Sequence, residues 1–325
     1  MSGFAALSPS NSESSTMIDT INAHNGFQGI WPALLTPLDA HGNIDHAKFA
    51  AHAKHLLQAG CKGVTPFGTT GEGPSFTLQE RMDALDQLIK SGIAPERIML
   101  STSCAALGDV VTLTRHAVAH GVHGCLMLPP FFFKGVSDEG VFNAYTQVID
   151  AMAQPSWRLY LYHIPQVAGV GLSHNVIAQL IARYPHIIAG IKDSGCERAF
   201  SVSLAQAFMP DITVYVGNEP DLPTMGRLGS TGAISGLANF LPKLVHRSVL
   251  APDGASHAAD AQRIQAMLDL LKPFALLPAL KGVMSVLHND EAWLRVRAPL
   301  VALPPAQLAL LRQSLQGFAV NPQTD

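Results

Sequence analysis

The sequence predicts an α/β protein, a (β/α)8 TIM barrel with a C-terminal helical extension. Three observations support this fold class. Short apolar runs alternate with amphipathic stretches of helical period from residue 27 onward. Eight such runs precede a helical C-terminal region, and eight strands close a barrel of this kind. No glycine-rich nucleotide fingerprint follows the first run, which counts against the competing doubly wound open sheet.

The eight apolar runs are the expected barrel strands. They are GIWPALLTPL (29–38), GVTPFG (63–68), RIMLST (97–102), GCLMLPP (124–130), RLYLYHI (158–164), IIAGIK (187–192), TVYVG (213–217) and GAISG (232–236). A short run that is apolar throughout is typical of a parallel strand covered on both faces.

The segments between these runs carry helix signals. DHAKFAAHAKHLLQAG (45–60) and TLQERMDALDQLIKSG (77–92) are amphipathic and end in glycine, which commonly stops a helix. SHNVIAQLIARYP (173–185) begins at a serine that can cap the first turn and ends at a proline. Helical patterns continue after residue 236; one such helix completes the barrel and the others form the extension.

The chain therefore divides into three parts. Residues 1–26 are Ser-rich and are expected to be a disordered leader. Residues 27–254 form the barrel, and residues 255–325 form the C-terminal helical extension.

Composition narrows the function classes. Only 14% of the 325 residues are charged, which indicates that some surface is buried in a homo-oligomer. A net charge of −3 gives no sign of a nucleic acid or membrane partner. The N-terminal region has no basic start followed by an apolar core, and four scattered cysteines form no C-x-x-C pair. We therefore expect a cytoplasmic protein without a zinc ribbon or a disulfide framework.

Lys192 raises the first functional question, because an apolar strand ends in an ammonium group. In a barrel the active site lies at the carboxyl ends of the strands, where Lys192 is expected. Burial there would lower the pKa of the amine, and a neutral amine attacks ketones and aldehydes. The resulting imine, once protonated, is an electron sink for C–C cleavage, C–C formation or loss of water.

Two neighbouring segments could complete such a site. Tyr162 ends the preceding strand and offers a phenol as a proton shuttle. FGTTGEGP (67–74) follows the second apolar run; its glycines and the hydroxyls of Thr69 and Thr70 suit a carboxylate or a phosphate. Each element also has an ordinary structural explanation: Asp193 could pair with Lys192, Tyr162 could be a core residue, and the glycine-rich stretch could be a plain turn.

At these residues the sequence resembles a known family. GTTGE (68–72), YHIPQVAGVGL (162–172) and GIKDS (190–194) are similar to motifs of the dihydrodipicolinate synthase / N-acetylneuraminate lyase family of class I Schiff-base pyruvate aldolases. The three motifs stand in the family's order, and the likeness runs from about Gly29 to the end of the chain.

The resemblance implies roles for individual residues. Lys192 matches the Schiff-base lysine, and Tyr162 matches the proton-relaying tyrosine. Thr69 and Thr70 match the residues that hold the α-carboxylate, with Thr69 also in a hydroxyl relay. Gly190 and Ile234 match positions that line the pyruvyl pocket. The family uses no metal or organic cofactor and is usually tetrameric, and its substrates are small 2-oxo acids.

Three departures from the family pattern stand out. Val167 occupies the position at which family synthases bind a substrate carboxylate with an arginine, and valine cannot make that pair. The family's relay tyrosine after Pro-Pro is replaced within Phe131–Phe133. This stretch has one residue more than the family pattern, so the position of the relay tyrosine falls on one of the three phenylalanines. Phe132 is the candidate substrate-site residue. His163 stands where asparagine is common and is a candidate hydrogen bonder, a pH-sensitive acid–base group or a packed strand histidine.

We expect no metal site from the sequence. His52 and His55 share a helical face, but no carboxylate or cysteine stands near them in the sequence.

The leading function is a Schiff-base lyase that cleaves, condenses or dehydrates pyruvate or a 2-keto-3-deoxy type acid. The alternatives are a true 4-hydroxy-tetrahydrodipicolinate synthase, which condenses pyruvate with aspartate semialdehyde, and a non-catalytic oxo-acid binder.

Overall fold

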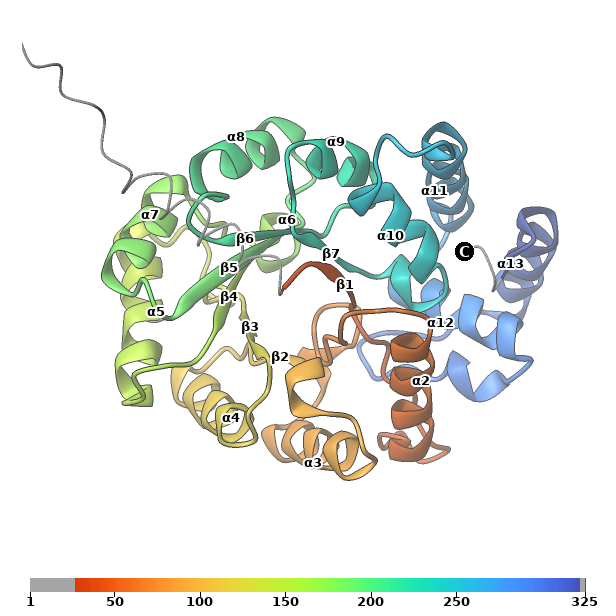
Figure 1. The fold of residues 1–325 in the computed structure, drawn as a ribbon. Coiled ribbons are helices and arrows are strands. Elements are labelled where there is room, and N and C mark those ends of the chain that lie inside the picture. The colour runs from red at the N-terminus through yellow and green to blue at the C-terminus, as the bar shows by residue number, and fades with distance from the viewer. Residues whose placement is uncertain (1–26, 322–324) are drawn as a thin grey trace, which may run out of the picture.

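The computed structural model describes residues 27–321 and 325, and the expected leader lies outside them. Seven parallel strands within the described residues form one sheet in the order β1–β7–β6–β5–β4–β3–β2 (Figure 1). The strands are β1 Gly29–Pro32, β2 Met99–Ser101, β3 Gly124–Met127, β4 Leu159–His163, β5 Ile188–Asp193, β6 Thr213–Val216 and β7 Gly232–Ser235. The sheet curls into a nearly closed TIM barrel, as the alternating pattern predicts.

The expected strand at 63–68 is the exception. It lies between β1 and β2 and pairs with each only through isolated bridges, Thr65 to Ala33 and Val64 to Ile98. Leu34 N–H donates to Thr65 O at 3.0 Å, and Met99 N–H donates to Val64 O at 2.9 Å. Pro66 has no N–H to continue a ladder. The prediction of eight full strands is therefore corrected to seven strands and a bridging segment.

A ring of helices surrounds the sheet (Figure 1). The helices up to the end of the barrel are α2 His46–Gln58, α3 Leu78–Lys90, α4 Leu107–Ala119, α5 Asp138–Met152, α6 Pro165–Ala168, α7 His174–Arg183, α8 Arg198–Phe208, α9 Leu222–Arg227 and α10 Pro242–Leu250. The expected serine cap is present, because Ser173 Oγ accepts the N–H of Val176 at 3.2 Å. Short 3₁₀ turns lie at Gly73–Ser75, Pro95–Arg97, Glu219–Asp221, Leu237–Asn239 and Glu291–Leu294.

Two apolar layers hold the barrel together. The larger layer lies between the strands and the helices; the smaller fills the barrel and includes Trp31, Met99, Leu126, Tyr160, Tyr215 and Ile234. Inside the barrel, the hydroxyl of Tyr160 meets His123 Nε2 at 2.8 Å, and that of Tyr215 donates to Phe27 O at 2.7 Å. Both partners precede strands, so these two phenols are satisfied at the amino end of the barrel, away from Lys192.

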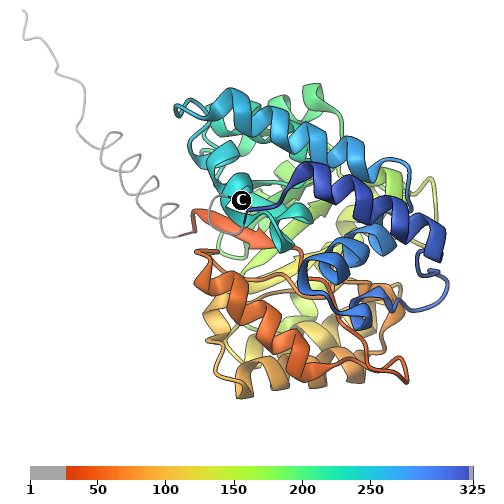
Figure 2. The same ribbon diagram turned by 90° about the vertical axis from the view of Figure 1, so that its right-hand side faces the viewer.

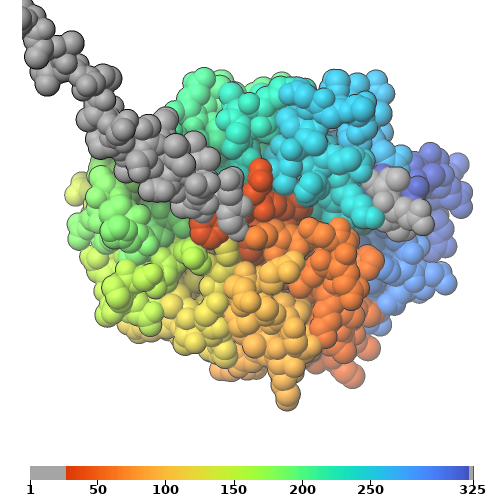
Figure 3. Space-filling model, in the orientation of Figure 1, coloured from red at the N-terminus to blue at the C-terminus, as the bar shows by residue number. Residues whose placement is uncertain are grey.

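Three further helices follow the barrel, α11 His257–Leu271, α12 Leu276–His288 and α13 Pro305–Phe318. They stand together on one side of the molecule (Figure 2), and the dark-blue C-terminal part forms the right-hand edge of the space-filling view (Figure 3). Among the described residues, no single helix has the length and apolarity to cross a membrane, and only the sharply bent pair α11 and α12 passes that test jointly.

Candidate active site

Strand register places the candidate catalytic side chains together. Tyr162 on β4 is paired directly with Lys192 on β5, and His163 is paired with Asp193. Successive side chains of a strand point to opposite faces. Tyr162 belongs to the cluster inside the barrel, so Lys192 also faces the interior, whereas His163 and Asp193 face the helices.

The Lys192 amine is buried beside a phenol. The residue is only 4% exposed, and its Nζ donates to the Tyr162 hydroxyl at 3.1 Å. Asp193 is not its ion-pair partner: on the other strand face it accepts from Ser201 Oγ at 2.5 Å and from Gly195 N–H at 2.8 Å. No ion pair in the described part of the chain includes Lys192. The position of this amine at the carboxyl end of a barrel strand is where a nucleophile of such a fold would stand.

Thr69 extends this contact. Its Oγ1 lies 3.3 Å from the Tyr162 hydroxyl, which therefore stands between Thr69 and Lys192. Three separate elements supply the three groups: the loop after the bridging segment, β4 and β5. A phenol in hydrogen-bond reach of both an amine and a second hydroxyl can accept a proton from one side and deliver one to the other.

The loop that carries Thr69 and Thr70 is tightly wound. A Cβ on Gly71 would lie 2.6 Å from Leu34 O, and one on Gly73 would lie 1.9 Å from Phe67 O. These two glycines thus allow the loop's own backbone to pack closely, and the approach of a ligand to this loop stays a prediction. Within the described chain, the N–H groups of Thr69 and Thr70 have no hydrogen-bond acceptor. They remain as two free donors near Tyr162, a suitable arrangement for binding an anion.

An ion pair with the C-terminal extension anchors the same loop. Glu72 has a left-handed backbone (φ 57°) and pairs with Lys281 of α12, both side chains being fully buried. Glu72 Oε2 also accepts the N–H of Arg297 at 2.9 Å, and Lys281 Nζ donates to Arg295 O at 2.6 Å. Burial lowers the pKa of Lys281, and the Glu72 carboxylate opposes that shift. The extension therefore holds the loop at the barrel mouth.

Two residues at the site were not singled out from the sequence. A Cβ on Gly217, just after β6, would lie 2.8 Å from Lys192 Cε and 2.0 Å from Ser194 Oγ. Gly217 thus leaves the space that the lysine side chain occupies. Ser194 Oγ borders the same space, is buried, and has no hydrogen-bond partner within the described residues. In the sequence Gly217 is visible only as the glycine that ends the seventh apolar run, TVYVG (213–217), and its role depends on which strand neighbours Lys192.

The other predicted pocket residues lie around this centre. Gly190 is two residues before Lys192 on the same face of β5, and a Cβ there would lie 2.9 Å from the ring of Tyr160. Ile234 is buried inside the barrel on β7. Thr70 lies next to Gly236, which follows β7. Their contact with a substrate stays a prediction.

Two residues predicted to lie in the substrate site, His163 and Phe132, do not face the barrel interior. His163 Nδ1 accepts the N–H of Leu172 at 3.0 Å, its ring stacks on Phe200, and burial lowers its pKa. It is a packed strand histidine on the outer face of β4, because it follows the inward-facing Tyr162. Phe132 is 73% exposed. Phe131, and not Phe132, packs against the residues inside the barrel.

His52 and His55 of α2 have different surroundings, because His55 is exposed. His52 is buried, and its Nε2 donates to Asn239 Oδ1 at 3.0 Å. Burial lowers the pKa of His52 to about 4, so the ring is neutral in the folded chain at neutral pH.

Known proteins resemble this chain in sequence and in fold. The model of the dihydrodipicolinate synthetase family matches residues 26–316. An uncharacterized DapA-like lyase of Chloroflexus aurantiacus is 32% identical over 292 residues, which cover 89% of this chain and 96% of that protein.

Two solved structures have the same fold. Dihydrodipicolinate synthase from Agrobacterium tumefaciens C58 superposes with a TM-score of 0.84 at 34% identity, over 90% of this chain and 99% of that one. YagE of Escherichia coli K12, a prophage protein of the dihydrodipicolinic acid synthase family solved with pyruvate, has a TM-score of 0.81 at 24% identity. That match covers 91% of this chain and 99% of YagE, and it speaks for the fold alone.

Proposed function

The chain belongs to the dihydrodipicolinate synthetase family and is a lyase of that family, and on this premise we propose a Schiff-base mechanism with pyruvate or a related 2-oxo acid as substrate. The observation that carries the proposal is the environment of the Lys192 amine. It is buried, it forms no ion pair with a carboxylate among the described residues, and it donates a hydrogen bond to the Tyr162 hydroxyl at 3.1 Å. A structural lysine would be expected to reach solvent or pair with an acid.

The reaction begins at the lysine. The lone pair of Lys192 Nζ attacks the C2 carbonyl and forms a carbinolamine, whose hydroxyl leaves as water when Tyr162 supplies a proton. The protonated imine then accepts the electron pair of the bond broken at C3. For an aldol cleavage this bond is C3–C4, the C4 hydroxyl proton passes to a base, and an aldehyde departs. Protonation of the enamine at C3 and hydrolysis of the imine return pyruvate and the free amine.

The threonine loop is proposed to bind the α-carboxylate. The free N–H groups of Thr69 and Thr70 and the adjacent hydroxyls offer donors on the side of Tyr162 that faces the loop. Fixing the carboxylate there would orient C2 toward Lys192. Thr69 Oγ1 would also exchange protons with the Tyr162 hydroxyl, which lies 3.3 Å away.

The other half of the substrate is proposed to be less polar than aspartate semialdehyde. Val167 offers no charged group to a second carboxylate, and Phe131 adds an apolar ring next to the barrel interior. An aliphatic or aromatic aldehyde, or a 2-keto-3-deoxy acid with few charged groups, fits these residues better.

A second candidate is a true 4-hydroxy-tetrahydrodipicolinate synthase. It is favoured by the 34% identity to the Agrobacterium tumefaciens synthase over nearly the whole chain. The two candidates are separated by incubating the protein with pyruvate and either aspartate semialdehyde or a panel of apolar aldehydes, and measuring pyruvate consumption. We expect a higher kcat/KM with an apolar aldehyde; a higher value with aspartate semialdehyde would select the synthase.

We also propose a cytoplasmic homo-oligomer, either a dimer or a tetramer. Phe132 and Phe133 are more than 70% exposed, and Val167 on α6 is 58% exposed. Lys134 Nζ donates to Ala168 O at 2.8 Å and so joins the phenylalanine loop to α6. Neighbouring exposed apolar side chains are typical of an interface, and sedimentation velocity at several concentrations tests it. The four free cysteines are compatible with a reducing compartment.

A further inference from the structure

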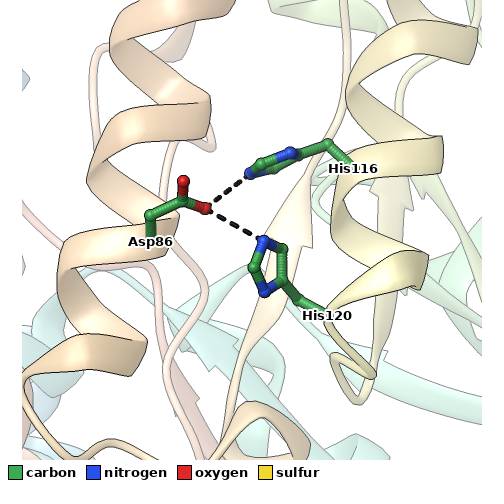
Figure 4. A group of neighbouring side chains, drawn as sticks. All are labelled: Asp86, His116 and His120. Atoms are coloured by element: carbon green, nitrogen blue, oxygen red, sulfur yellow. Dashed lines mark hydrogen bonds and ion pairs between the residues drawn. The ribbon is translucent and has the colours of Figure 1, made fainter.

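A cluster of three metal-ligand side chains lies on the outer helical layer, separate from the catalytic centre. Asp86 of α3 faces His116 of α4 and His120, which caps α4 (Figure 4). His116 Nε2 lies 2.7 Å from Asp86 Oδ1, and His120 Nε2 lies 3.1 Å from the same oxygen. We propose that Asp86, His116 and His120 form a binding site for a divalent transition-metal ion of the zinc type.

The ligand types and their spacing support this assignment. Imidazole nitrogen and carboxylate oxygen are both zinc ligands, and histidines at i and i+4 share one face of a helix. Zinc bonds of about 2.0–2.2 Å in a tetrahedral site separate the ligand atoms by roughly 3.3–3.6 Å. The two nitrogen–oxygen distances, 2.7 Å and 3.1 Å, are shorter than this, and all three ligand atoms lie within 4.8 Å of one another, so side-chain movements alone can admit an ion between them.

The cluster is accessible and already directed toward one point. The side chains are partly exposed, at 45% for Asp86, 23% for His116 and 36% for His120. An ion could therefore enter without unfolding, and water could fill the fourth position. The last turn of α4 ends at His120, and the partial negative charge at a helix C-terminus favours a cation there.

The site is at the opposite end of the barrel from Lys192. His120 precedes β3, which begins at Gly124, whereas Lys192 stands at the carboxyl end of β5. An ion bound here cannot touch the reacting atoms. It would instead join α3 to α4, two neighbouring helices, and stabilise the folded chain through binding.

The test uses the full-length untagged protein, stripped with a chelator and titrated with Zn²⁺ in a calorimeter. We expect one ion per chain with micromolar or tighter affinity. The substitutions Asp86→Asn, His116→Gln and His120→Gln should each weaken binding at least tenfold. Asn and Gln keep hydrogen-bonding capacity but are poor zinc ligands, so the fold should persist, which circular dichroism checks. His186→Ala removes an exposed histidine elsewhere and should leave binding unchanged.

A second readout identifies the coordination. Co²⁺ in place of Zn²⁺ should give visible absorption bands typical of a tetrahedral site, and these bands should disappear in Asp86→Asn. The proposal is overturned if Zn²⁺ does not bind below millimolar concentration. It is equally overturned if binding persists unchanged in the three ligand variants, because the ion would then occupy another place.

Discussion

The Lys192 amine and the Tyr162 hydroxyl are hydrogen-bond partners, 3.1 Å apart, on directly paired residues of two adjacent strands. This geometry predicts separate roles. Tyr162→Phe removes only the hydroxyl, so the Lys192 amine should still reach the substrate carbonyl, but the proton that lets the carbinolamine hydroxyl leave as water is lost and imine formation should slow. We expect kcat to fall about 10²–10⁴-fold, the usual contribution of a positioned proton donor. Steady-state kinetics of the variant check this, and an unchanged kcat would remove Tyr162 from the relay.

Gly217 should be required for the position of the lysine side chain. In Gly217→Ala the new methyl group would meet Lys192 Cε at 2.8 Å and Ser194 Oγ at 2.0 Å, which is too close for either to stay in place. We expect imine formation with pyruvate to slow at least tenfold. Gly108→Ala is the matched control, because a Cβ on Gly108 would meet nothing within 4 Å. Equal rates in the two variants would contradict the assigned role.

The buried pair Glu72–Lys281 should stabilise the threonine loop. Lys281→Met leaves the Glu72 carboxylate buried without its partner, and we expect a loss of about 3–5 kcal/mol in the free energy of unfolding. Adding Glu72→Gln removes the stranded charge and should recover part of that loss. Denaturant unfolding of the two single variants and the double variant measures the coupling; strictly additive effects would show that the two residues do not interact.

Stability should fall in mild acid because buried histidines are kept neutral. Burial lowers the pKa of His52 from 6.5 to about 4. At pH 5 the unfolded chain binds a proton at this residue and the folded chain does not, so unfolding takes up protons and stability falls as the pH drops from 6.5 toward 4. This one residue accounts for a loss of about 2 kcal/mol between pH 7 and pH 5.

His52→Gln tests this pH dependence. Glutamine can still donate an N–H to Asn239 Oδ1 but does not titrate. Between pH 7 and pH 5 the variant should lose about 2 kcal/mol less unfolding free energy than the parent protein. Parallel curves of unfolding free energy against pH for the two proteins would mean that His52 does not contribute.

Much of the site could be predicted because it depends on strand ends. Tyr162 and Lys192 stand at the ends of consecutive apolar runs, and parallel strands place such ends at one rim. Side chains alternate between the two faces of a strand, so His163, which follows the inward-facing Tyr162, must face outward and does not enter the barrel interior. The apolar run at 63–68 predicts a full strand, but the segment forms only isolated bridges. Pro66 lacks the N–H that would continue the ladder, and apolar character alone does not show this effect.

The remaining features depend on contacts between distant segments. Glu72 meets Lys281 only after α12 packs against the barrel mouth. His116 and His120 have the spacing of a helical pair in the sequence, but Asp86 joins them only through the packing of α3 on α4. Which of the three phenylalanines reaches the barrel interior is likewise set by the path of the loop, not by residue type.

The most direct test of the mechanism is to trap the imine. The protein is incubated with pyruvate and borohydride, and the intact mass and the modified peptide are measured, with Lys192→Ala and Lys54→Ala, which removes an exposed lysine of α2, as paired variants. The account predicts one reduced pyruvyl group per chain, located at Lys192, absent from Lys192→Ala and present in Lys54→Ala. An adduct that persists in Lys192→Ala, or no adduct with pyruvate or any longer 2-oxo acid in the parent protein, would contradict it.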